Sequence, residues 1–219
     1  MSASVYLFDL DGTLIDRLPS LKQFLPEQYA CYGSSGAALL ESFVAGFLEL
    51  DRAGHAPKHE VYETLVREFM LNASVPELVA DFRRNAFKSC RPQPGALHVL
   101  EELRRRGIRL GVVTNGSVAA QEQKLNASGI APLVTFKLIS EAVGLRKTDP
   151  EIFLEAARRF NVTPSSCTFV GDHPEKDIVG TQKVGMRTVW LRHGRTWPRQ
   201  LSPPTEIAGL EELLTLQSC

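Results

Sequence analysis

The chain has 219 residues, enough for one large domain or two small ones around a substantial buried core. Hydrophobic residues make up 43% of the sequence and charged residues 23%, so the composition disfavours disorder. Lysine plus arginine and aspartate plus glutamate both number 25, which disfavours a nucleic-acid polymer as main partner but allows a locally positive site for a small anion.

The first predicted element is a strand, followed by a helical insertion. Residues 5–8 form an almost continuous apolar run, typical of a strand buried on both faces of a parallel sheet. From 17 to 90 there is no convincing strand. Apolar residues recur with a helical period at 39–48, 61–70 and 78–82, which predicts three or four packed helices in this insertion. Residues 31–36, within this insertion, are either a linker or a segment that helps to select substrate.

After residue 90, strands and helices alternate. Strands are predicted at 108–113, 134–139, 167–170 and 188–191, and helices at 95–106, 117–128, 149–160 and 175–184. This repetition implies right-handed crossovers. We therefore predict an α/β fold with a doubly wound, Rossmann-like parallel sheet and a small all-helical cap domain. Residues 1–16 and 91–219 form the predicted core, and residues 17–90 the cap.

Cysteine usage and hydropathy indicate the compartment. Four scattered cysteines without a CxxC pair make a zinc site or a disulfide framework improbable. No apolar run approaches the ~20 residues of a membrane span, and the first residues lack the features of a signal peptide. We expect a cytoplasmic monomer or homodimer without a membrane partner.

Acidic residues follow the first and fourth strands of the predicted core. Asp9 and Asp11 are two apart, so both carboxylates can face one ligand, while Asp172 and Asp177 follow the strand at 167–170. Four carboxylates around one lysine, Lys147, repel one another and are costly to bury without a cation. Mg²⁺ is favoured, because it accepts few protein carboxylates, keeps waters and works beside phosphate.

Groups suited to phosphate follow the second strand of the predicted core. Thr114, Asn115 and the amides of the next turn can donate hydrogen bonds to phosphoryl oxygens, and the helix beginning near Ser117 adds its positive end. Lys147 supplies a point charge, and Gly12 allows the chain to leave the first strand sharply.

Four segments, in this order, resemble the motifs of phosphatases in the haloacid dehalogenase-like hydrolase superfamily. They are DLDGT at 9–13, VVTNGS at 112–117, RKTDPEIF at 146–153 and VGDHPEKD at 170–177. The resemblance covers most of the chain, and the spacing is similar to that of members with a helical cap after the first strand. The segment that includes Gln121 and Lys124 resembles a branch with nucleotidases and an acylneuraminate phosphatase.

The resemblance implies a role for each acidic residue. Asp9 is the nucleophile that forms an aspartyl-phosphate, and Asp11 is the general acid and then the base that activates water. The implied Mg²⁺ ligands are Asp9, Asp11 through its backbone carbonyl, and Asp172. Asp177 supports Asp172, Lys147 or a metal-bound water.

The remaining roles belong to the phosphate-binding groups. Thr114 holds a phosphoryl oxygen with Asn115 beside it, and Lys147 balances charge on Asp9 and the phosphoryl group. Gly12 and Thr13 complete the first motif as supporting residues.

Two positions depart from the family pattern. Thr148 stands where proline commonly follows the lysine, which loosens the loop but keeps the charge. His173 stands where serine is frequent, and this histidine can approach the metal site and make activity sensitive to pH.

The function expected from these residues is Mg²⁺-dependent hydrolysis of a small phosphorylated metabolite: a phosphosugar, a phosphoglycolate-like acid or a nucleoside monophosphate. A phosphomutase on the same fold is the main alternative, because the core motifs do not separate it from a phosphatase. A non-catalytic phosphate-binding protein is less favoured, because binding alone does not require the acid at Asp11.

Overall fold

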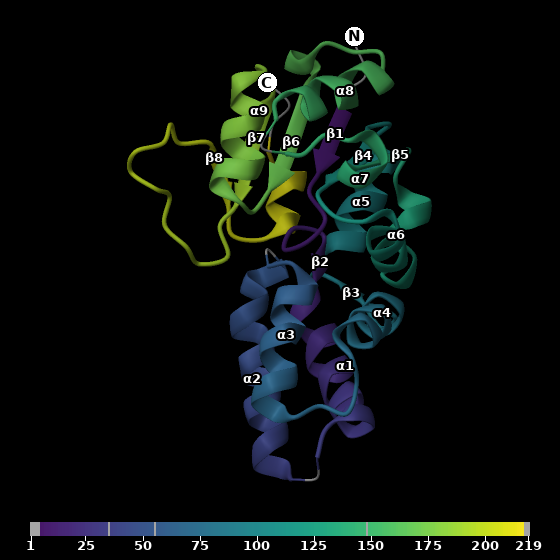
Figure 1. Cartoon of the computed structure of the whole chain (residues 1–219). Coiled ribbons are helices and arrows are strands. Elements are labelled where there is room, and N and C mark those ends of the chain that lie inside the picture. Colours follow the sequence, from purple (N-terminus) through teal and green to yellow (C-terminus); the bar gives the residue numbers. More distant parts are fainter. Residues whose placement is uncertain (1–4, 35, 55, 148, 217–219) are drawn as a thin grey trace. The chain divides into compact units, whose positions relative to one another are not determined.

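The computed structural model describes residues 5–34, 36–54, 56–147 and 149–216. The chain divides into two compact units, which are coloured along the sequence in Figure 1. Met1–Asp16 together with Cys90–Cys219 make up the sheet unit, and Arg17–Ser89 make up the helical unit.

Within the described residues, the sheet unit contains six parallel strands in the order β5-β4-β1-β6-β7-β8 (Figure 1). They are β1 (Val5–Phe8), β4 (Arg109–Thr114), β5 (Phe136–Ile139), β6 (Cys167–Gly171), β7 (Arg187–Leu191) and β8 (Thr205–Ile207). From β1, the sheet continues through β4 to β5 on one side and through β6 and β7 to β8 on the other. The predicted doubly wound, Rossmann-like fold is thereby confirmed, with β1 at the position where the strand order reverses.

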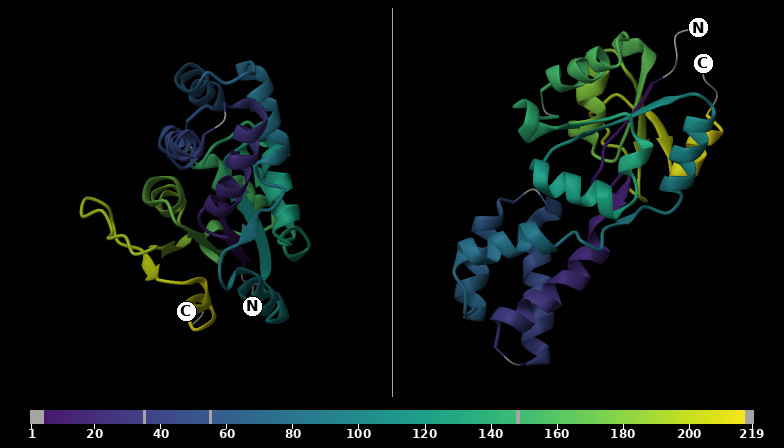
Figure 2. Two further views of the ribbon diagram at one scale, coloured as in Figure 1. Left: turned by 90° about the horizontal axis from the view of Figure 1, so that it is seen from below. Right: turned by 90° about the vertical axis from the view of Figure 1, so that its right-hand side faces the viewer.

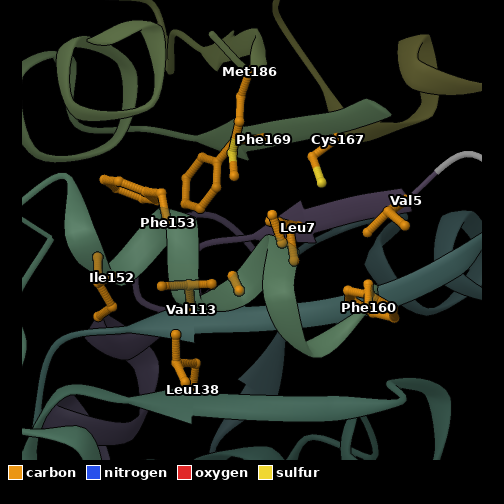
Figure 3. Close-up of a cluster of buried hydrophobic side chains, with 12 residues drawn as sticks. Val5, Leu7, Val113, Leu138, Ile152, Phe153, Phe160, Cys167, Phe169 and Met186 are labelled. Carbon is orange, nitrogen blue, oxygen red and sulfur yellow. The ribbon is translucent and has the colours of Figure 1, made fainter. Parts of the chain in front are cut away.

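An apolar core covers one face of this sheet, against α8 (Glu151–Arg159) (Figure 3). Leu7 of β1 lies beside Phe169 of β6, and Phe153 of α8 meets the Phe169 ring edge to face at 5.2 Å between centroids. Because successive strand residues alternate between faces, Phe8 and Val112 point to the other face, where α5 (Ala96–Arg105) packs against β4 and the turn Leu210–Leu214. Helices on both faces explain why β1 is buried over its whole length and β4 is buried from Leu110 to Thr114 (Figure 2).

The remaining elements of the sheet unit connect these layers. α6 (Val118–Ala127) follows β4, and α7 (Ser140–Val143) follows β5. β2 (Ile15–Asp16) and β3 (Arg91–Pro92) form a short antiparallel pair. Short turns of 3-10 helix cover Ala131–Leu133 and Pro164–Ser166. The single helix predicted over 175–184 is a six-residue π-helical segment, Pro174–Val179, that continues into α9 (Gly180–Lys183).

The helical unit consists, over its described residues, of α1 (Arg17–Tyr32), α2 (Ala37–Asp51), α3 (Lys58–Phe69) and α4 (Val75–Asn85), with a short turn Arg52–Gly54. Aromatic side chains fill its centre, where Phe47 stacks on Phe82 at 5.6 Å between ring centroids. The buried carboxylate of Asp51 is paired with Lys58 at 2.6 Å and with Arg17 at 3.4 Å. Residues 31 and 32 belong to the end of α1.

Across the described parts of both units, no helix is both long enough and apolar enough to cross a membrane.

Candidate active site

Asp9 lies at the carboxyl end of the central strand β1. Its backbone N–H donates to the Val170 carbonyl at 2.9 Å, and its side chain is buried, with Thr13 Oγ1 donating to Oδ2 at 3.2 Å. The chain then turns at Gly12, which has φ +89°, and a Cβ there would lie 3.0 Å from the carboxyl group of Asp172. Both the backbone angle and the close approach therefore require glycine at this position.

Lys147 brings the first and fourth strand ends together. Its Nζ pairs with Asp9 Oδ1 and, at 2.7 Å, with Asp177 Oδ1, and the lysine is buried. Its backbone N–H donates to Asn115 Oδ1 at 2.9 Å, so Asn115 fixes the loop that carries the lysine. Asn115 thus contacts the site through the Lys147 backbone.

Asp9, Asp172 and Asp177 form a cluster in which one carboxylate oxygen of each lies within 4.8 Å of the others. Asp177 is fully buried, and its Oδ2 accepts a hydrogen bond from the His173 N–H at 3.0 Å. Asp172 is half-buried and pairs with the exposed Arg195 at 3.0 Å. The structure therefore gathers the two acids of the fourth motif beside Asp9.

The burial of this cluster changes its protonation equilibria. Burial raises the pKa of Asp9 well above its ordinary value; Lys147 opposes this shift, and the carboxylates of Asp177 and Asp172 add to it. Burial also raises the pKa of Asp172, and Asp177 contributes in the same direction. For Lys147, burial alone would lower the pKa, but the carboxylates of Asp177 and Asp9 outweigh burial and raise it. In the cation-free fold, the carboxylate forms of Asp9 and Asp172 are therefore disfavoured.

These residues fit a hard divalent cation. The donors are all carboxylate oxygens, the type of ligand that Mg²⁺ prefers, and the charge of the cation would favour the ionised forms that burial disfavours. The acidic cluster contains two of the predicted ligands, Asp9 and Asp172, together with Asp177, the predicted supporting residue. The third predicted ligand is the Asp11 backbone carbonyl, and the Asp11 carboxylate is not part of the cluster.

The Asp11 carboxylate instead lies against α6. Lys124 Nζ contacts its two oxygens at 2.7 and 2.9 Å, and Gln121 Nε2 donates to Oδ2 at 2.8 Å. The same Gln121 nitrogen donates to Thr114 Oγ1 at 2.6 Å. Gln121 therefore connects Asp11, the proposed acid, to Thr114, the proposed phosphate ligand.

Of the two residues that depart from the family pattern, Thr148 and His173, the structure describes His173. Thr148 falls outside the described residues. The His173 Nδ1 accepts a hydrogen bond from the Lys176 N–H at 3.3 Å, so its ring caps the following helical turn, and burial lowers the pKa of this histidine.

Sequence reasoning gave no role to Gln121, Lys124, His193 or Arg195. His193 Nε2 lies 2.5 Å from the Gly12 carbonyl oxygen, and Arg195 donates to the Asp172 backbone carbonyl at 2.7 Å. For Gln121 and Lys124 a signal existed: both stand on the face of a predicted helix that also carries the buried Leu125. His193 and Arg195 lie after β7, where no pattern marked them.

Comparison with known proteins gives consistent matches. A family model described as haloacid dehalogenase-like hydrolase matches residues 3–185. The chain is 37% identical over 143 residues to a glyceraldehyde 3-phosphate phosphatase of Methanopyrus kandleri, an alignment that covers 64% of this chain and 60% of that protein. It is 32% identical over 199 residues to a phosphoserine phosphatase of Thermus thermophilus, covering 87% of this chain and 73% of that protein.

A solved structure extends the match to the fold. YfnB of Bacillus subtilis, described as a HAD-hydrolase bound to magnesium, superposes with a TM-score of 0.80 at 24% sequence identity, and the match covers 100% of both chains. The four motifs resemble one superfamily. The first, second and fourth lie at the carboxyl ends of the neighbouring strands β1, β4 and β6, and Lys147 of the third pairs with Asp9 and Asp177. With the family model spanning most of its length, the chain belongs to the haloacid dehalogenase-like hydrolase family.

Proposed function

We propose that this chain is a Mg²⁺-dependent phosphatase that hydrolyses a small-molecule phosphate monoester through an aspartyl-phosphate on Asp9. The observation that carries the proposal is the position of Asp9, buried at the switch point of the sheet and held by Lys147 and Thr13. Relatives named as phosphatases of glyceraldehyde 3-phosphate and of phosphoserine support hydrolysis of phosphoric monoesters as the activity.

In the first step, an oxygen of Asp9 attacks the phosphorus atom. A bond forms between this oxygen and phosphorus, the bond from phosphorus to the leaving oxygen breaks, and the Asp11 carboxyl group transfers its proton to that leaving oxygen. Thr114 donates to a phosphoryl oxygen, while Lys147 balances the negative charge of Asp9 and of the phosphoryl group.

In the second step, water attacks the phosphorus atom of the aspartyl-phosphate. The Asp11 carboxylate accepts a proton from the water, the bond between Asp9 and phosphorus breaks, and inorganic phosphate leaves. One water is consumed, and both aspartates return to their starting forms.

Asp9, Asp172 and the backbone carbonyl of Asp11 would hold the cation, with Asp177 supporting Asp172 and Lys147. When bound, Mg²⁺ supplies positive charge that offsets the carboxylates and the charge developing on the phosphoryl oxygens.

The substrate we propose is a phosphosugar, a phosphoglycolate-like acid or a nucleoside monophosphate. A nucleic-acid polymer and a membrane are not proposed as partners, and the monomer or homodimer and the cytoplasmic location stay predictions. The helical unit is proposed to act as a cap that admits substrate and excludes bulk water.

The test is phosphate release from 4-nitrophenyl phosphate by the wild-type protein and by Asp9→Asn. We expect the substitution to lower turnover at least about 10³-fold, because the amide is a poor nucleophile. Glu206→Gln, which changes an exposed carboxylate on β8, is the matched control and should keep wild-type turnover. Turnover by Asp9→Asn at the wild-type rate would exclude the nucleophile assignment. A phosphomutase would transfer the phosphoryl group back to substrate and release little phosphate.

A further inference from the structure

Helix α6 directs two polar side chains into the interior of the sheet unit. Gln121 and Lys124 are three residues apart, so they lie on the same face of the helix, and they are 1% and 4% exposed. Burying an ammonium group is unfavourable unless a carboxylate pairs with it. A lysine held in the interior in this way needs a specific partner, and Asp11 supplies that carboxylate.

The contacts of these two side chains define the orientation of the Asp11 carboxylate. Lys124 Nζ lies 2.7 and 2.9 Å from its two oxygens, and it also donates to Gln121 Oε1 at 2.8 Å. Gln121 Nε2 donates to Asp11 at 2.8 Å and to Thr114 at 2.6 Å. The Asp11 side chain keeps 23% of its surface exposed, so the group is fixed from the α6 side and accessible from another.

We infer that Lys124 and Gln121 are positioning residues that hold Asp11 in place for its two proton transfers. This inference rests on the proposed function. A general acid must stay within about 2.6–3.2 Å of the atom that it protonates, and contacts to both oxygens restrict rotation of the carboxylate. Gln121 adds a fixed distance between this carboxylate and Thr114, so the proton donor keeps its place relative to the bound phosphoryl group.

The structure offers a matched pair of variants. Lys124→Met keeps an unbranched side chain, one heavy atom shorter, and removes the ammonium charge beside Asp11. Lys137→Met removes a different lysine–carboxylate pair of the same 2.7 Å length, which links Lys137 of β5 to Glu122 of α6 and does not touch Asp11. If Lys124 only fastens α6 to the sheet unit, both variants should behave alike.

The readout is phenol release in the first turnover from two substrates. The leaving group of 4-nitrophenyl phosphate departs readily as an anion, whereas the more basic one of phenyl phosphate depends on a proton. For Lys124→Met we expect a loss of about 10–100-fold with phenyl phosphate and less than about 5-fold with 4-nitrophenyl phosphate. The substrate concentration that gives half of the maximal first-turnover rate should be nearly unchanged. Lys137→Met should leave both rates within about 2-fold of wild type. Equal losses with the two substrates, or an equal effect of Lys137→Met, would overturn the inference.

A double-mutant cycle tests whether Lys124 acts through Asp11. In an Asp11→Asn background, Lys124→Met should slow phenyl phosphate cleavage less than about 2-fold further, because the group that it positions is already lost. A full additional loss would overturn the inference. Lys124→Arg, which keeps a cation for Asp11, should restore most of the rate.

If Lys124→Met does not fold, Gln121→Leu replaces it, because it removes the hydrogen bonds to Asp11 and Thr114 but leaves the lysine. The same selective loss with phenyl phosphate is then expected, and its absence refutes the inference. Wild-type activity that Asp9→Asn abolishes and Lys124→Met leaves unchanged contradicts only the inference. Absence of phosphatase activity in the wild type contradicts the proposed function and the inference together.

Discussion

The Asp177 side chain packs directly on Gly171, the last residue of β6. A Cβ at Gly171 would lie 2.5 Å from the Asp177 Cβ and 2.6 Å from its Cγ and Oδ2. Asp177 has little freedom to move, because it is fully buried and its oxygens are held by Lys147 Nζ and by the His173 N–H. In Gly171→Ala, either the strand end or the carboxylate must shift.

The size of the effect follows from the overlap. Forcing one extra methyl group into a packed interior costs about 1–3 kcal/mol. For a chain of this length, each kcal/mol lowers the melting temperature by about 2–4 °C. A loss of about 2 kcal/mol therefore corresponds to a decrease of about 4–8 °C. Displacement of Asp177 also disturbs the acidic cluster, so the stabilisation by added Mg²⁺ should shrink in the same variant.

The assay is thermal unfolding followed by circular dichroism, with and without Mg²⁺. Gly209→Ala is the control, because Gly209 has an extended backbone with φ −144° and no atom within 4 Å of an added Cβ. We expect Gly209→Ala to melt within about 1 °C of wild type. Equal melting temperatures for the two alanine variants would show that Asp177 moves aside without loss, and would refute the claim that Lys147 and His173 fix it.

Two further predictions concern the charges of the cluster. Mg²⁺ should raise the melting temperature more at pH 8 than at pH 5. Burial raises the pKa values of Asp9 and Asp172, so the cation-free fold loses stability as the pH rises from the ordinary carboxyl pKa through the raised values. A bound cation offsets that loss, and its effect is therefore larger at the higher pH. Equal Mg²⁺-induced shifts at both pH values would contradict this assignment. Lys147→Met should lower the free energy of unfolding at pH 8 without Mg²⁺ by about 3–5 kcal/mol in urea titrations, because it leaves buried carboxylates unpaired. The exposed Lys183→Met is its control, and a similar small change in both variants would argue against the buried pair.

The sheet and its polar rim could be predicted from the sequence because the strands are short and apolar and the polar motifs follow them directly. The register of the strands explains why short apolar strands followed by polar motifs were enough to predict the position of the site. Phe8 lies opposite Val112 in β4 and Val170 in β6, so the residues that follow these three strands emerge side by side. The alternation of strands and helices was enough to predict the fold class. A central position of β1 was enough to predict that the motif residues lie close together.

Contacts between distant polar residues could not be predicted in this way. In α1, no helix was assigned from its own residues, because the buried face includes Ser20 and Gln28 among apolar side chains and Pro26 lies inside the helix. Gln28 is acceptable in the interior because it accepts a hydrogen bond from the Tyr62 hydroxyl at 2.7 Å, a partner 34 residues away. Partners at such separations become visible only once the helices are packed.

The same limitation affected the charge argument for the cation. The sequence predicts four carboxylates, including that of Asp11, around the single ammonium group of Lys147. In the structure, Lys124 pairs with Asp11, so the Asp11 charge is already balanced by another lysine. The case for a cation therefore depends on Asp9, Asp172 and Asp177, which lie within 4.8 Å of one another in the described structure. This separation also suits the chemistry, because a nucleophile must be ionised while an acid–base group must exchange a proton. Asp9 lies in the cluster that a cation would occupy, whereas Asp11 is held by a lysine outside that cluster, so the nucleophile and the acid–base group have separate charged partners.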